Sequence, residues 1–102
     1  MKDENMKALF IIVNSGFSEE IIDFAREEGA AGATILNARG VGLNIEKIMG
    51  ITIDSEREIV LSVVKEEMAR KIMAVVKEKA GIASSAHGVC FMLPVDEMTQ
   101  ML

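Results

Sequence analysis

Residues 8–13 read ALFIIV, a short run that is apolar at every position and rich in β-branched side chains. Such a run is typical of a strand at the centre of a sheet, where both faces are covered. Residues 14–16 (NSG) interrupt the run, and apolar residues then follow at helical spacing until Gly29. We therefore expect a first strand over 8–13 and a helix over 18–28, with Ser18 as its N-cap.

The next stretches predict two further strands separated by a long loop. Residues 33–38 (ATILNA) mix polar and apolar side chains, which favours a strand near a sheet edge, whereas residues 58–64 (EIVLSVV) are apolar on both faces. Between them the pattern is lost over residues 39–56, where glycines interrupt isolated isoleucines. We expect a flexible loop at about residues 40–56 that contains at most a short strand at 51–53.

A second helix and a last strand complete the chain. From residue 66 apolar side chains line one face of a helix that Gly81 ends, and residues 89–93 (VCFML) form a strand that Pro94 closes. This element order predicts a ferredoxin-like βαββαβ sandwich of the α+β class, with four antiparallel strands and two helices on one face. We expect residues 1–102 to form one such domain. Because two strands are apolar on both faces, other copies of the chain should cover the second face.

The composition excludes several classes of protein. The 102 residues carry a formal net charge of −5, are 50% hydrophobic, and include four Phe but no Tyr or Trp. This balance argues against disorder and against a nucleic-acid partner, which needs basic residues and exposed rings. No segment is long and apolar enough for membrane insertion, and the single cysteine cannot form an internal disulfide. The N-terminus does not resemble a signal peptide, so we expect a cytoplasmic protein.

Four segments of the sequence resemble the PII-like (nitrogen regulatory protein P-II) signal-transduction family. They are KALFIIVN (7–14), GATILNARGVG (32–42), EKIMGITIDSEREIVLSVV (46–64) and HGVCFMLPVDEM (87–98). The resemblance implies the ferredoxin-like fold, a homotrimer, and an adenine nucleotide (ATP, ADP or AMP) bound in clefts between subunits. It also implies that the loop between the second and third strands engages a regulated protein, such as a transporter, an enzyme or a regulator. The chain has no tyrosine, so modification of a loop tyrosine, found in some PII proteins, is not expected.

The resemblance also assigns candidate nucleotide-binding residues. Gly40 and Gly42 match the two close glycines that follow the family's second strand, and Arg57 matches a lysine that binds phosphate there. His87 and Gly88 lie in the last loop, where the family has two glycines and then a lysine. That lysine and the family's C-terminal arginines have no counterpart in this chain. The resemblance therefore implies a nucleotide with fewer phosphates, or none, in preference to tight binding of ATP.

Alternative interpretations of these residues stay open. On the residues alone, the two glycines after the second strand are a tight turn. His87 and Cys90 could bind a metal, although a loop histidine and a buried thiol are the simpler interpretation. Asp54, Glu56 and Glu58 alternate and could hold a divalent cation, but a solvated edge is the simpler interpretation. No nucleophile, base and oxyanion site can be assembled, so we expect a non-enzyme. Two other functions remain: a trimeric divalent-cation-binding protein of the same fold, or an effector-free interaction trimer.

Overall fold

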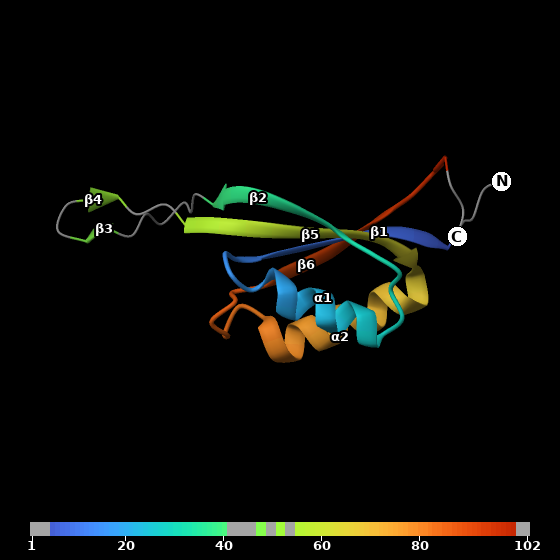
Figure 1. Cartoon of the computed structure of the whole chain (residues 1–102), viewed down its shortest axis with the longest axis horizontal. Coiled ribbons are helices and arrows are strands. Elements are labelled where there is room, and N and C mark those ends of the chain that lie inside the picture. Colours follow the sequence, from blue (N-terminus) through green and yellow to red (C-terminus); the bar gives the residue numbers. More distant parts are fainter. Residues whose placement is uncertain (1–4, 41–46, 49–50, 53–54, 100–102) are drawn as a thin grey trace.

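The computed structural model describes residues 5–40, 47–48, 51–52 and 55–99, of which 47, 48, 51, 52 and 55 are described by their backbone alone (Figure 1). Its elements in chain order are β1 (Met6–Asn14), α1 (Ser18–Glu27), β2 (Thr34–Gly40), β3 (Lys47–Ile48), β4 (Ile51–Thr52), β5 (Ser55–Lys65), α2 (Glu66–Ala80) and β6 (Val89–Pro94).

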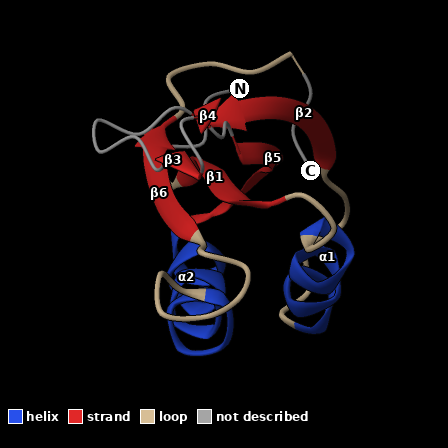
Figure 2. Cartoon of the chain, turned by 90° about the vertical axis from the view of Figure 1, so that its left-hand side faces the viewer, coloured by secondary structure: helices blue, strands red, loops and turns tan. Residues whose placement is uncertain are grey.

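Four of the strands form one antiparallel sheet in the order β2-β5-β1-β6. Figure 2 shows both helices on the same side of this sheet. The first and third long strands, β1 and β5, occupy the centre, as their apolar sequences indicate. The predicted ferredoxin-like fold is therefore confirmed.

The irregular segment between β2 and β5 is shorter than the sequence predicts. Arg39 pairs with Glu56 and Gly40 with Ser55, so both strands continue into the range expected to be a loop. The reason is that backbone hydrogen bonds build a ladder whatever the side chains are, and the apolar pattern therefore ends before the strands do. Within the segment β3 pairs with β4, while residues 41–46, 49–50 and 53–54 lie outside the described residues.

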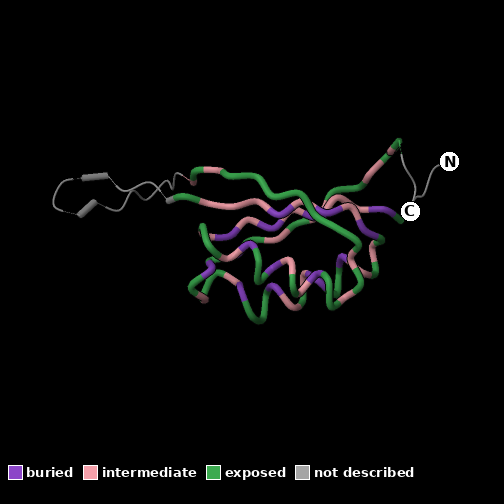
Figure 3. The backbone as a smooth tube through the Cα atoms, viewed as in Figure 1, coloured by how far each residue is buried: buried purple, intermediate pink, exposed green. Residues whose placement is uncertain are grey.

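The hydrophobic core lies between the sheet and the two helices (Figure 3). Alternate residues of the central strands point to the helices, so the period of two determines which strand residues belong to the core. Its buried members are Leu9, Ile11, Val13, Ile21, Ala25, Val60, Val64, Ala69, Ile72, Val76, Ala80 and Ala86.

The face of the sheet opposite the helices is also apolar. The register places Leu36, Ile59, Ile12 and Val89 in one row across this face, and Leu61, Phe10 and Phe91 in the next. The rings of Phe10 and Phe91 are stacked, with centroids 5.1 Å apart and planes 6° from parallel. Within one protomer Leu36 is 45% exposed, Val89 46% and Leu93 48%, so this open face presents a contiguous apolar surface.

The start of α1 differs from the sequence expectation. Ser18 is the first residue of the helix, and Phe17 occupies the N-cap position. The Phe17 side chain makes no capping hydrogen bond. Instead Glu58 of β5 reaches the helix end: its Oε1 accepts hydrogen bonds from the backbone N–H of Gly16 at 2.7 Å and of Ser18 at 3.4 Å. The prediction of Ser18 as the N-cap is wrong because a carboxylate from a neighbouring strand satisfies these amides.

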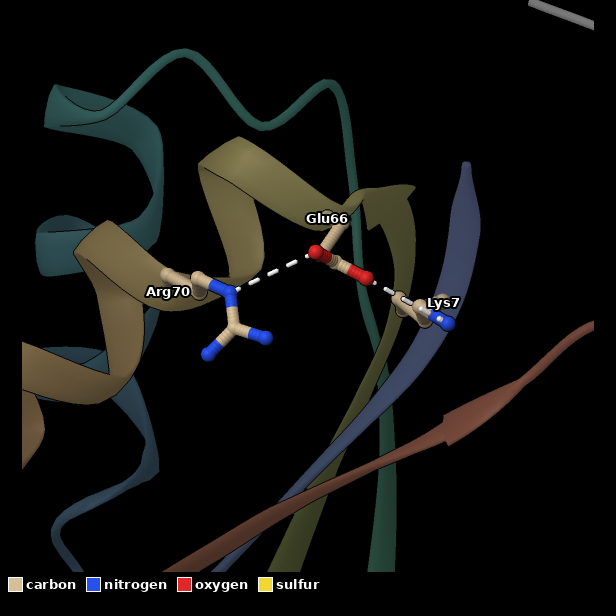
Figure 4. A network of polar contacts seen from close by, with 3 residues as sticks. All are labelled: Lys7, Glu66 and Arg70. Atoms are coloured by element: carbon tan, nitrogen blue, oxygen red, sulfur yellow. Dashed lines mark hydrogen bonds and ion pairs between the residues drawn. The ribbon is translucent and has the colours of Figure 1, made fainter. Parts of the chain in front are cut away.

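A chain of ion pairs fixes the start of α2 against β1 (Figure 4). Glu66 lies in the first turn of α2, and its Oε1 is 3.4 Å from Lys7 Nζ. Its other oxygen, Oε2, accepts a hydrogen bond from Arg70 Nε at 3.4 Å, one helical turn further on. The Lys7 side chain is only 19% exposed, so this contact is more protected from water than the Arg70 contact.

Candidate functional site

Gly40 and Arg57 are brought together at one end of the sheet. Gly40 ends β2, and Arg57 lies in the neighbouring strand β5, opposite Ala38. A Cβ atom on Gly40 would lie 3.0 Å from Arg57 Nε and 3.2 Å from its Cγ. The glycine therefore leaves room for the arginine side chain, which lies on the open face of the sheet.

Asn14 connects this pair to the last loop, a role that the sequence reasoning missed. Asn14 ends β1 and lies opposite Arg57 in the ladder. Its backbone N–H donates to the Ala86 carbonyl at 2.8 Å, and its side-chain Nδ2 donates to the Ser85 carbonyl at 2.9 Å. An asparagine directly after an apolar strand is a weak signal, since it is equally typical of a turn.

His87 and Gly88 follow the loop that Asn14 holds. His87 is exposed and adopts a left-handed backbone with φ 47°, and its N–H donates to the Ser84 carbonyl at 3.1 Å. Gly88 is buried, and its N–H donates to the Ala80 carbonyl at 2.7 Å. A Cβ on Gly88 would lie 2.2 Å from the Ala80 oxygen. Packing against the end of α2 therefore requires a glycine at position 88, whatever else it does.

The predicted site residues thus lie in a line across one end of the sheet. Gly40 and Arg57 are on neighbouring strands, Asn14 follows on the next, and His87 and Gly88 lead into the last strand. With strands about 4.8 Å apart, this line is roughly 14 Å long. Gly42 lies outside the described residues.

A groove lies further along the same open face, at the β2 edge. Its volume is about 450 Å³, and none of the described residues that line it is charged. Its lining residues are Ala31, Gly32, Ala33, Thr34, Leu61, Ser62, Val63 and Met98. Leu61 and Arg57 lie on the same face of β5 four residues apart, or about 13 Å along the strand. Sequence reasoning did not identify this groove, because its walls come from segments about thirty residues apart.

The structure does not bring Glu56 and Glu58, two of the three candidate cation ligands, together as a cation site. Glu58 accepts hydrogen bonds from the backbone N–H groups of Gly16, just before α1, and of Ser18, its first residue. These bonds lower the pKa of Glu58, and the bond from Gly16 contributes most. The carbonyl of Glu56 accepts a hydrogen bond from Ser15, its side chain is exposed, and Asp54 lies outside the described residues. The described part of the chain holds no group of three or more His, Cys, Asp or Glu residues placed to bind a metal.

The Cys90 thiol is poorly suited to metal binding and to nucleophilic chemistry. Cys90 is partly buried on the helix side of β6, opposite Ile11. Burial raises its pKa to about 12. The thiolate, which is the form that binds metals and acts as a nucleophile, is therefore strongly disfavoured at neutral pH.

The fold is that of a ferredoxin-like α+β domain, and the comparisons identify the family. The chain matches the family described as nitrogen regulatory protein P-II over residues 6–101. It therefore belongs to the P-II family, as the sequence resemblance indicates. A search of the curated proteins gives no significant match.

Solved structures of PII proteins share the fold. CPII, a nitrogen regulatory PII-like protein from Thiomonas intermedia K12 bound to ADP, AMP and bicarbonate, has a TM-score of 0.70 and 18% identity, over 94% of this chain and 96% of its own. The GlnK–ATP complex of B. subtilis has a TM-score of 0.69 and 19% identity, over 88% and 81%. Arabidopsis thaliana PII bound to citrate has a TM-score of 0.65 and 19% identity, over 92% and 78%. Among the described residues, none of the helices could cross a membrane.

Proposed function

We propose that the chain is a homotrimeric PII-like regulator that binds an adenine nucleotide between protomers. The nucleotide would contact Gly40, Gly42, Arg57, His87 and Gly88, and its binding would favour one conformation of residues 41–54. A regulated protein, such as a transporter, an enzyme or a regulator, would read that conformation. For such a shift in population, the nucleotide must bind the conformation that the regulated protein recognises more tightly than it binds any other conformation of these residues.

The apolar open face supports assembly into a closed oligomer. An isolated soluble domain rarely exposes a contiguous apolar surface of this kind, and burial of such area is the main driving force of association. Phe91 is 39% exposed within one protomer and stacks on Phe10 at the centre of this face. Self-association of the sheet faces would cover these rings.

The placement of Arg57 is the observation that carries the nucleotide proposal. Its guanidinium lies beside Gly40 on the open face, and the uncharged groove lined by Leu61 lies about 13 Å away along the same strand. An extended nucleotide can span such a distance, with its base in the groove and its phosphate on the guanidinium, which binds phosphate through paired hydrogen bonds. CPII and GlnK, which share the fold, were solved with adenine nucleotides bound.

Titration of the whole chain with ATP, ADP and AMP tests the proposal. We expect at least one nucleotide to raise the melting temperature, and ADP or AMP to bind at least as tightly as ATP. At one hundred times its dissociation constant, a ligand stabilises the folded state by about 2.7 kcal/mol. Arg57→Ala should weaken binding tenfold or more, because it removes a charge-assisted hydrogen bond. Arg26→Ala is the matched control: Arg26 is an exposed residue of α1, with Nη1 3.6 Å from an Asp23 oxygen.

The other outcomes separate the alternative functions. Equal nucleotide affinity in Arg57→Ala and the unmodified chain would show that the site is misplaced. Melting that responds to divalent cations alone, and is lost when His87 and Cys90 are replaced, would favour the cation-binding protein of the same fold. No response to any nucleotide or cation would favour an interaction trimer without an effector.

A further inference from the structure

A second groove lies on the other side of the molecule, between α2 and the edge strand β6. Its volume is about 660 Å³, within the range of small-molecule sites. Its apolar lining includes Met73, Ala74, Ile82 and Cys90, and the charged residues in the described part of its lining are Arg70 and Lys77. Gly88, which is among the proposed nucleotide contacts, also lines this groove. Cys90, however, faces the helices, whereas Arg57 and Gly40 lie on the open face, so the groove and the proposed phosphate position lie on opposite faces of the sheet.

The groove is elongated and its shape follows from the helix. Arg70, Ala74 and Lys77 are spaced by four and three residues and therefore lie on one face of α2. The rise per residue places Arg70 and Lys77 about 10 Å apart, with apolar surface between them. Ile82, just beyond the helix, is 63% exposed, although its side chain is large and apolar. An occupant that covered Ile82 would gain hydrophobic free energy.

The charge of the groove favours an anion, in a protein whose net charge is −5. Both charged residues that line it are basic. Glu66 accepts a hydrogen bond from Arg70 Nε. Figure 4 shows both terminal nitrogens of the Arg70 guanidinium directed away from Glu66. Glu66 is shared with Lys7, so the three-residue network keeps a net positive charge. The guanidinium is a planar donor that matches a carboxylate.

We propose that this groove binds a linear carboxylic acid, with its carboxylate on Arg70 and its hydrocarbon chain lying along Ala74 toward Ile82. Burial of the chain supplies the affinity, and the guanidinium fixes the orientation. The Cys90 thiol suits the apolar floor, because its burial keeps it uncharged. Nucleotide binding plays no part in this proposal.

Calorimetric titration of the whole chain with decanoate, octanoate and decanol tests the proposal. Decanoate should bind roughly tenfold more tightly than octanoate, since two further methylenes are buried. Decanol has a similar chain without the carboxylate and should bind at least tenfold more weakly than decanoate. The methyl resonance of Met73, which lines the groove, should shift on addition of decanoate.

Variants of α2 locate the binding. Ala74→Phe fills the groove from an exposed position and should abolish decanoate binding without loss of folding. Arg70→Gln should weaken binding about tenfold, whereas Lys71→Gln, an exposed residue of the same helix that does not line the groove, should leave it unchanged. Arg57→Ala should also leave it unchanged, which separates this proposal from the nucleotide site.

Several results would overturn the proposal. These are the absence of any heat or Met73 shift with decanoate, equal binding of decanol and decanoate, and equal weakening by Arg70→Gln and Lys71→Gln. A fourth is a change in oligomer mass caused by Ala74→Phe, measured by light scattering. That result would show that a second copy of the chain, and not a carboxylic acid, occupies the groove.

Discussion

Replacement of Gly88 by alanine separates a packing role from a ligand-binding role at this position. The new Cβ would lie 2.2 Å from the Ala80 carbonyl oxygen, whereas real Cβ contacts of this kind are at least 3.0 Å. Both atoms in conflict belong to structure that cannot rotate away, so the last loop must move from the end of α2. This movement also stretches the 2.7 Å hydrogen bond from the Gly88 N–H to the same oxygen.

The expected cost is large for a domain of this size. Overpacking costs about 1–3 kcal/mol, and loss of the hydrogen bond adds about 1 kcal/mol. Gly88→Ala should therefore lower the free energy of unfolding by roughly 2–4 kcal/mol, which corresponds to a fall in melting temperature of roughly 10–25 °C. The comparison must be made at one protein concentration, because oligomerisation makes the melting temperature depend on it.

Circular dichroism melting without ligand is the assay, and Gly32→Ala is the control. No atom lies within 4 Å of a Cβ built on Gly32, so that variant should change stability by less than about 1 kcal/mol. If Gly88→Ala melts like the unmodified chain but no longer binds nucleotide, the packing argument fails and Gly88 serves the ligand directly.

Three further predictions test contacts described above. Asn14→Ala removes the side-chain bond to the Ser85 carbonyl, and should cost about 1 kcal/mol and speed amide exchange at His87, measured by NMR; unchanged exchange would argue against Asn14 as the residue that holds the loop. Glu58 has a lowered pKa in the folded state, so its stabilising effect is present above the unfolded value of 4.5 and is lost as pH falls through the folded value. Glu58→Gln should therefore destabilise the chain at pH 7 and lose that deficit in acid, whereas a deficit independent of pH would contradict the charge-based reason. Phe91→Asp places a charge on the open face and should reduce the assembly to protomers with unchanged far-ultraviolet circular dichroism; an unchanged mass in light scattering would exclude this face as the interface.

The fold could be predicted from the sequence because its decisive signals are local. The apolar runs at residues 8–13 and 58–64 identify the two central strands, and the helical spacing after Ser18 and from residue 66 identifies both helices. The apolar second face also follows from these runs. The bounds of the strands are less predictable. Backbone pairing alone extends β2 to Gly40 and makes β5 begin at Ser55.

The candidate site was only partly predictable because its contacts join distant parts of the chain. Arg57 and Gly40 were identified by resemblance, and the structure places them in contact. The bond from Asn14 to Ser85 spans 71 positions, and the bond from Gly16 to Glu58 spans 42. No local pattern encodes such pairings, so the sequence indicates Asn14 only as part of the interruption at residues 14–16, and Glu58 as part of a solvated edge.

The position of Arg57 on the open face has a consequence for any measurement of effector affinity. The side chain shares this face with the apolar residues that a closed assembly would bury. Protomer association and effector binding would then be linked by mass action, and each would strengthen the other. A dilute sample would report a weaker apparent affinity than a concentrated one, and the cellular abundance of the chain would itself set the effector concentration to which it responds.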